Sequence, residues 1–213
     1  MKNKAFTLAE ILIVLTLIGI ISIVMIRSTR SDNIDEKTNI AKAYKAIEVF
    51  DEASANVRDM GNKTDCPMGT LMYTTGKKAD GTYDYEIGLN LDADNKENSF
   101  FNIYSNYVKY EKTGLNFCNF SKYCSNNSIT TPIPAVKISG DTYVGIQILD
   151  SVSDCPNFYL PEVSGVITQR TKLKGGKAQC WAKLYIDTNG LNGPNTLGKD
   201  VFVFGMDENG INH

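Results

Sequence analysis

The stretch Phe6–Ile26, FTLAEILIVLTLIGIISIVMI, decides how the first part of this chain folds. Apart from the hydroxyls of Thr7, Thr16 and Ser22, it carries one polar side chain, the carboxylate of Glu10. As an α-helix, its 21 residues span roughly 31 Å, about the thickness of the hydrocarbon core of a bilayer. We therefore expect residues 6–26 to form the transmembrane half of a longer helix.

Glu10 is the residue in this stretch that needs an explanation. A carboxylate inside an apolar helix costs several kcal/mol unless it reaches the membrane interface or finds a partner. Glu10 lies about 6 Å along the helix from Phe6, so one interpretation places it among lipid headgroups. In the other, the chain is cut before Phe6, and Glu10 contacts the new α-amino group of its own or a neighbouring chain. No small-residue cleavage pattern follows the apolar run, which argues against an ordinary secretory signal.

The string Lys4–Leu15, KAFTLAEILIVL, resembles the processing signal of type IV pilins and type II secretion pseudopilins. The resemblance implies that a prepilin peptidase removes residues 1–5 as a leader peptide by cutting between Ala5 and Phe6, and that it methylates the amino group of Phe6. It also implies that Glu10 pairs with the amino terminus of an adjacent subunit during assembly. Ala5 departs from the family pattern, which usually has glycine before the cut.

The same resemblance implies a function for the whole protein. We expect a structural subunit of a type IV pilus or a type II secretion pseudopilus that assembles into a helical filament. Its expected partners are copies of itself or other pilin-like subunits, the prepilin peptidase, the inner-membrane assembly platform and the membrane, with no nucleic acid required. The expected location is the inner membrane, crossed once with the head outside the cytoplasm, and then a periplasmic or extracellular filament. A membrane-tethered extracytoplasmic binding protein that does not polymerise is the alternative.

The helical pattern continues beyond the apolar stretch. Apolar or small side chains recur at three- and four-residue spacings along one stripe, with charged side chains on the other faces. Gly61 is a suitable helix end. We therefore expect one helix from about Phe6 to Met60, with an amphipathic half over residues 27–61. The predicted stripe consists of Ile40, Tyr44, Ile47, Phe50, Ser54 and Val57.

Residues 62–213 are expected to form a globular head on the second half of the helix. AVKISGDTYVGIQIL predicts a β-hairpin that turns at Ser139–Asp141, and CWAKLYID and DVFVFGM predict a second pair of strands. Together they predict an antiparallel sheet of roughly four strands over about residues 134–213. This sheet would pack on the long helix in a pilin-like α+β fold.

About residues 62–133 are expected to be a variable connection between the helix and the sheet. TLMYTT and YDYEIGL predict two short strands, while SFFNIYSNYVKYEK is compatible with a short helix or a strand. Its aromatic side chains are expected to cover the sheet rather than to form a binding surface. They are Phe100, Phe101, Tyr104, Tyr107 and Tyr110.

The five cysteines indicate disulfides if the head lies outside the cytoplasm. Short loop closures favour the pairs Cys118–Cys124 and Cys155–Cys180, with Cys66 left over, although other connectivities stay open. The chain has no CxxC pair, and its sole histidine is His213, so a zinc site is not expected.

The segment Asp187–Asp200, DTNGLNGPNTLGKD, combines oxygen-bearing side chains with glycines that permit tight turns. Hard cations such as calcium take six to eight oxygen ligands from flexible loops of this composition. The segment also resembles loops near the carboxyl end of pseudopilins and pilin-like proteins, some of which bind calcium. The competing interpretation is a loop whose side chains bond its own backbone without an ion. The candidate calcium ligands are Asp187, Asn189, Asn192, Asn195 and Asp200.

Catalysis finds no support in the sequence. The only histidine is terminal, so no nucleophile has a credible base, and no phosphate-binding or G-x-S-x-G motif is present. The formal net charge of −2 supplies no basic footprint for nucleic acid. We therefore expect a structural protein and not an enzyme.

Overall fold

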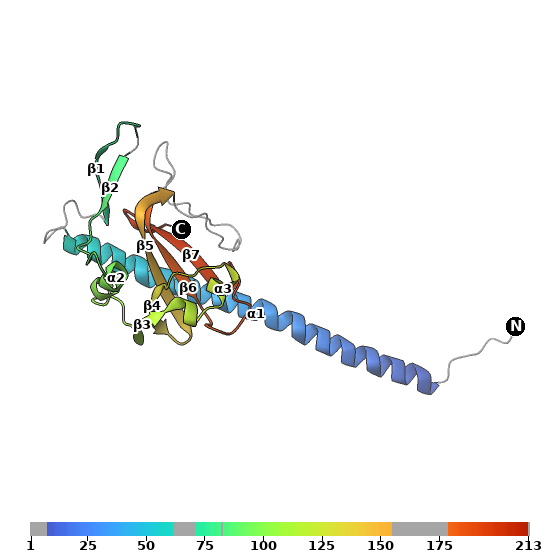
Figure 1. Ribbon diagram of the computed structural model, residues 1–213. Helices are drawn as coiled ribbons and strands as arrows, with labels where there is room; N and C mark the ends of the chain where they lie inside the picture. The colour runs from blue at the N-terminus through green and yellow to red at the C-terminus, as the bar shows by residue number, and fades with distance from the viewer. Residues whose placement is uncertain (1–7, 62–70, 82, 155–178, 213) are drawn as a thin grey trace. The chain divides into compact units, whose positions relative to one another are not determined.

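The computed structural model describes residues 8–61, 71–81, 83–154 and 179–212, and Figure 1 shows their helices and strands. The chain divides into two compact units, residues 1–38 and residues 39–213. The first unit contains the start of helix α1. The second contains the rest of α1 and every described strand.

Helix α1 runs from Leu8 to Gly61, a length of 54 residues, and it ends at the glycine predicted to stop it. No proline falls within this range, so the helical hydrogen-bond ladder loses no donor. Within the first unit, six large apolar side chains each expose between 53% and 61% of their surface: Leu12, Ile13, Val14, Leu15, Leu17 and Ile18. Among the helices of the described residues, none combines the length and the apolarity of a membrane span.

The buried face of α1 in the second unit differs from the predicted stripe. Tyr44 is 41% exposed and Ile40 is only half-buried, whereas three alanines on the helix are buried. Small side chains let a helix approach a sheet closely, so the contact face turns toward the alanines rather than toward the largest apolar residues. The buried residues of α1 in this unit are Asn39, Ala43, Ala46, Ile47, Phe50, Ala53, Ser54 and Val57.

The second unit is built on a six-stranded sheet in which every neighbouring pair is antiparallel and the strand order follows the chain. The α+β class with an antiparallel sheet is therefore confirmed, as is the hairpin turning at Ser139–Asp141. The strands are β3 (Lys112–Asn116), β4 (Pro134–Ser139), β5 (Thr142–Asp154), β6 (Gln179–Asp187), β7 (Val201–Asp207) and β8 (Gly210–Asn212).

The expectation of roughly four strands covers β4 to β7 and misses both edges. Strand β3 has three exposed residues followed by two half-buried ones, and it contains Gly114 at a positive φ of 66°. It therefore lacks the alternation of apolar and polar side chains that marks a strand. Strand β8 is only three residues long. Because β3 belongs to this sheet, the sheet begins before the predicted boundary at residue 134.

Alternate residues of the central strands point to opposite faces of the sheet. On β5, Val144 and Ile146 join the larger core beneath α1, while Tyr143 packs in a second, smaller core. On β6, Leu184 belongs to the larger core and Tyr185 to the smaller one. Both faces of the sheet are therefore covered, each by a different segment of the chain.

Helix α2 (Lys96–Tyr104) helps α1 to cover the first face. The ring of Tyr104 stacks on Phe100, with 4.0 Å between ring centroids, and lies 6.0 Å from the ring of Phe50 on α1. The hydroxyls of Tyr104 and Ser54 are hydrogen-bonded at 3.0 Å. The prediction that the aromatic residues of this region cover the sheet is confirmed, because all five lie in or against the larger core.

The predicted strands β1 (Met72–Lys77) and β2 (Tyr83–Ile87) pair as a separate two-stranded sheet. On the second face of the six-stranded sheet lie a 3-10 helix, η1 (Phe117–Asn119), and the short helix α3 (Tyr123–Asn126). Their approach is close at Gly145, where a Cβ would lie 3.0 Å from Ile133 Cγ2 and 3.0 Å from Phe117 Cβ.

Candidate cation site in the loop between β6 and β7

The predicted calcium loop is the connection between β6 and β7, two antiparallel neighbours whose register pairs Asp187 with Val201. Positive φ angles turn the chain at Gly190 (63°), Asn195 (52°) and Gly198 (82°). Glycine and asparagine tolerate this left-handed conformation better than other residues, which explains their abundance here. Both aspartates that bound the loop, Asp187 and Asp200, are completely buried.

Asp200 uses both carboxylate oxygens to hold the backbone of the loop. Its Oδ2 accepts a hydrogen bond from the Asn195 N–H at 2.7 Å, and its Oδ1 accepts one from the Thr196 N–H at 2.7 Å. These charge-assisted bonds fix the second half of the loop. For Asp200, the interpretation that loop side chains bond their own backbone is therefore confirmed.

Asp187 satisfies only half of its carboxylate. Oδ1 accepts hydrogen bonds from the backbone N–H groups of Asn189 (3.1 Å) and Gly190 (2.6 Å). Its Oδ2 is buried and has no hydrogen-bond partner. The side-chain Oδ1 of Asn189 is also buried without a hydrogen-bond partner. The Nδ2 of the same side chain donates to the carbonyl of Gly193 at 3.2 Å. Because a buried acceptor without a donor costs about 1–3 kcal/mol, two of them so close in sequence need a physical reason.

The raised pKa of Asp187 also indicates that its carboxylate lacks a positively charged partner. Burial raises the pKa of Asp187 to about 6, the charge of Asp200 raises it further, and two backbone N–H groups oppose the rise. The Ser121 hydroxyl lies near enough to the carboxylate to oppose the rise as well, although its hydrogen bond goes to Asn195 Oδ1 and leaves Asp187 Oδ2 without a partner. Lys42 Nζ donates to the carbonyl of Thr188 at 3.1 Å, and no ion pair joins Asp187 to another described residue. At neutral pH the loop therefore holds a buried negative charge without a cationic partner among the described side chains.

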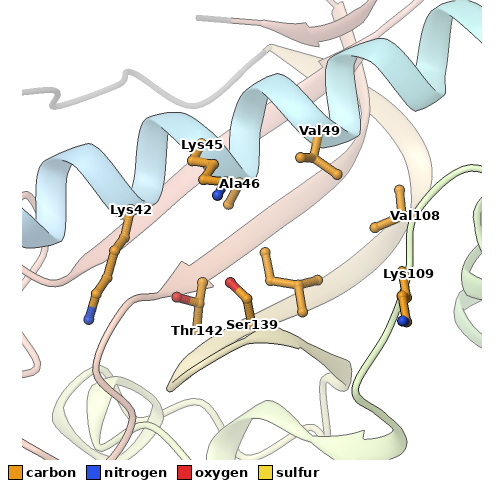
Figure 2. Close-up of a pocket in the computed structure, with 9 residues that line it drawn as sticks. Lys42, Lys45, Ala46, Val49, Val108, Lys109, Ser139 and Thr142 are labelled. Atoms are coloured by element: carbon orange, nitrogen blue, oxygen red, sulfur yellow. The ribbon is translucent and has the colours of Figure 1, made fainter.

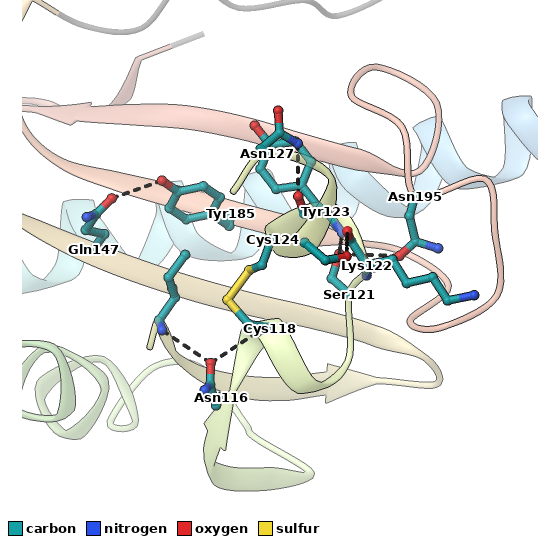
Figure 3. Close-up of a disulfide and its surroundings, with 12 residues drawn as sticks. Asn116, Cys118, Ser121, Lys122, Tyr123, Cys124, Asn127, Gln147, Tyr185 and Asn195 are labelled. Carbon is teal, nitrogen blue, oxygen red and sulfur yellow. Dashed lines mark hydrogen bonds between the residues drawn. A yellow bond between two sulfur atoms is a disulfide. The ribbon is translucent and has the colours of Figure 1, made fainter. Parts of the chain in front are cut away.

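Asn195 has a structural role. Its Oδ1 accepts hydrogen bonds from the Lys122 N–H at 2.7 Å and from the Ser121 hydroxyl at 3.5 Å, and its Nδ2 donates to the carbonyl of Asn192 at 3.2 Å. Figure 3 shows Asn195 reaching from its loop to the segment that carries the disulfide. The side-chain Oδ1 of Asn195 is therefore already used as an acceptor. The side chain of Asn192, another predicted ligand, is exposed.

The residues that fit a hard cation are a subset of the five predicted ligands. The unpartnered oxygens are Asp187 Oδ2 and Asn189 Oδ1, and Asp200 contributes a second carboxylate to the same loop. No cluster of three or more His, Cys, Asp or Glu side chains suited to a metal occurs in the part of the chain that the structure describes. A cation here would therefore depend on amide and backbone carbonyl oxygens and on water to complete six to eight ligands.

The disulfide predicted between Cys118 and Cys124 is present, with 5.3 Å between the Cα atoms. Asn116 Oδ1 supports it by accepting hydrogen bonds from the N–H groups of Cys118 (3.1 Å) and Ile133 (3.3 Å), as Figure 3 shows. Cys180 is fully buried and disulfide-bonded. Its predicted partner Cys155 and the predicted free thiol Cys66 lie outside the described residues.

The contacts of Ser121, Lys122 and Asn116 were not predicted. Ser121 and Lys122 contact Asn195, which lies 74 and 73 residues further along the chain. No local spacing in the sequence indicates contacts over such a distance. The structure does not describe the predicted processing site. Ala5 and Phe6 lie outside the described residues, and for Glu10 only the helical backbone is described.

Compared with protein-family models, with curated proteins and with solved structures, the chain finds no match.

Proposed function

We propose that this chain is a structural subunit of a helical filament of the type IV pilus and type II secretion pseudopilus class. The observation that carries the proposal is the apolar helix that follows Glu10, whose six large side chains over residues 12–18 each expose more than half of their surface. Apolar surface of this extent favours burial against lipid or against other apolar helices.

In this proposal the apolar part of α1 contacts lipid before assembly and other apolar helices after it. The precursor is held in the inner membrane by residues 6–26, with its head outside the cytoplasm, and a prepilin peptidase cuts between Ala5 and Phe6. The helices then exchange lipid for one another as subunits enter the filament. Head-to-tail contacts that do not close into a ring generate an open helical assembly.

Glu10 sets the register of that assembly. Its carboxylate pairs with the methylated amino group of Phe6 on the adjacent subunit. An unpaired carboxylate in the apolar filament core is costly, so slipped registers are disfavoured. The rest of the helix supports the same proposal, because its buried stripe packs on an antiparallel sheet as a pilin-like head requires.

A second function, cation binding by the loop between β6 and β7, is favoured by the two buried oxygens without partners. We propose that Asp187 Oδ2 and Asn189 Oδ1 bind a divalent cation such as calcium, while Asp200, whose oxygens hold the loop backbone, adds negative charge to the same loop. Such a cation would stabilise the head rather than perform catalysis. Within the family resemblance, this loop favours the secretion pseudopilus, whereas the cysteine-bearing variable region favours the pilus, so the proposal covers both.

Filament assembly is tested by replacing Glu10. The variant Glu10→Ala is expected to lower the yield of filaments seen by electron microscopy at least about tenfold, because an uncompensated terminal ammonium is left in the core. Glu48→Ala, which removes an exposed glutamate from the same helix, is the matched control and is expected to leave the yield unchanged. Full filament yield from Glu10→Ala would contradict the proposal. A chain that is stable in the membrane but never polymerises would instead support the tethered binding protein.

A further inference from the structure

A groove of about 240 Å³ lies between α1 and the β4–β5 hairpin turn (Figure 2). Its floor is apolar and comes from α1, from the segment after α2 and from β4. Its rim carries three lysines. The floor is lined by Ala46, Val49, Val108 and Ile138, the exposed rim by Lys42, Lys45, Lys109 and Ser139, and the buried Thr142 completes the lining.

The rim is positively charged without local compensation. No carboxylate of the described residues lines the groove, and neither Lys45 nor Lys109 forms an ion pair with a described residue. The acidic residues beside the hairpin turn are already engaged, because Lys137 pairs with Glu111 at 3.7 Å and with Asp141 at 3.8 Å. The groove therefore offers an apolar floor beside the ammonium groups of Lys45 and Lys109, while Lys42 donates to the Thr188 carbonyl, and this suits a short acidic segment with a small apolar residue.

The turn at residues 91–95, LDADN, has this chemistry. Asp92, Ala93 and Asp94 are exposed, and neither carboxylate pairs with a described cation. Two hydrogen bonds hold the turn in shape: the Asp94 N–H donates to Asp92 Oδ1 and the Asp92 N–H donates to Ser99 Oγ, both at 3.1 Å. A preformed turn loses little conformational entropy when it binds.

The same chain does not place this turn in its own groove. The turn leads directly into α2, whose Phe100 and Tyr104 are fixed in the core, and none of residues 91–95 lines the groove.

We propose that the lysine-rimmed groove of one subunit binds the acidic turn 91–95 of a second copy, with Ala93 over the apolar floor and the carboxylates of Asp92 and Asp94 against Lys45 and Lys109. The contact joins two different surfaces, so it can repeat from subunit to subunit, and it gives an open filament when the rotation between neighbours does not close into a ring. This inference rests on the proposed filament and names one of its head-to-head interfaces.

A charge swap tests the interface in the full-length chain. Self-association in detergent is measured by sedimentation for Lys45→Glu/Lys109→Glu, for Asp92→Lys/Asp94→Lys and for the two pairs combined. Each pair alone is expected to weaken association at least about tenfold, since it juxtaposes like charges, and the combination is expected to restore it. Lys112→Glu/Lys122→Glu, at exposed lysines outside the groove, is the matched control and is expected to have little effect. Equal association of all variants, or failure of the combination to restore it, would overturn the interface.

Carbodiimide coupling of mixed ¹⁴N- and ¹⁵N-labelled chains gives a direct second measurement. The proposal expects coupled peptides that join Asp92 or Asp94 of one chain to Lys45 or Lys109 of another, also in the Glu10→Ala background. Coupled peptides without any filament would refute the filament and keep the interface, whereas filaments without coupled peptides would refute the interface alone. If Lys45→Glu/Lys109→Glu loses binding to vesicles containing phosphatidylglycerol while self-association is unchanged, the groove serves anionic lipid and the proposal is wrong.

Discussion

At the scale of single residues, the carboxylate of Asp187 has the largest consequence. One oxygen receives two backbone hydrogen bonds, while the other is buried without a partner. Burial raises the pKa of Asp187 to about 6, above the usual value of 3.8. The folded state therefore holds this proton more tightly than the unfolded chain does. In the absence of a cation, the contribution of Asp187 to stability is full below about pH 4 and is lost as pH rises through about 6.

This asymmetry predicts opposite effects of Asp187→Asn with and without calcium. In chelator at pH 7.5, the variant is expected to be more stable than the wild type by up to about 3 kcal/mol, because the neutral amide keeps the Oδ1 acceptor and removes the buried charge. With calcium, the wild type is expected to gain thermal stability and the variant is not. Both are measured by calorimetry.

Asp59→Asn, at an exposed position of α1, is the control and is expected to behave as the wild type under both conditions. If the wild type melts at the same temperature in calcium and in chelator, the loop binds no calcium. If Asp187→Asn is destabilised in chelator, the unpartnered oxygen is not a source of strain.

At the scale of elements, the sequence predicts what repeats locally and misses what depends on distant contacts. Helix α1, the hairpin turning at Ser139–Asp141 and the β6–β7 pair all carry strong periodic or turn signals, and all three are present. Tyr44 was assigned to the buried stripe but is exposed, because buried alanines bring the sheet to a neighbouring face of α1.

In the candidate cation loop too, the sequence predicts the local composition but not the distant contacts. Composition alone nominates Asp187, Asn189 and Asp200, but it does not distinguish them from Asn195, whose oxygen is used by Ser121 and Lys122. That distinction depends on a contact between segments far apart in the chain. No sequence spacing encodes which of several asparagine oxygens remains unpaired.

The packing of η1 and α3 on the sheet predicts a cost for adding one methyl group. Gly145→Ala is expected to destabilise the fold by about 1–3 kcal/mol, because the new Cβ would lie 3.0 Å from both Ile133 and Phe117. Gly76→Ala is the matched control, since a Cβ there meets nothing within 4 Å, and its effect is expected to stay within about 0.5 kcal/mol. Urea unfolding under non-reducing conditions measures both. Equal stability of the two variants would show that the segment does not press on the sheet as described.

At the scale of the whole molecule, the proposed assembly needs three surfaces of different chemistry. Apolar side chains over residues 12–18 are available for lipid or neighbouring helices. The lysine-rimmed groove and the acidic turn 91–95 are available for contacts between heads. Among the described residues these surfaces are exposed in a single chain, and the proposed filament of repeated copies would cover all three.

Mass spectrometry of the mature amino terminus shows whether a prepilin peptidase processes this chain. We expect the chain isolated from its own cells to begin at Phe6, to lack residues 1–5 and to carry one methyl group on its α-amino nitrogen. Ala5→Gly, which restores the residue usual in the family, is expected to give the same terminus. A mature protein that still begins at Met1, or that begins at Phe6 without the methyl group, would contradict processing by a prepilin peptidase.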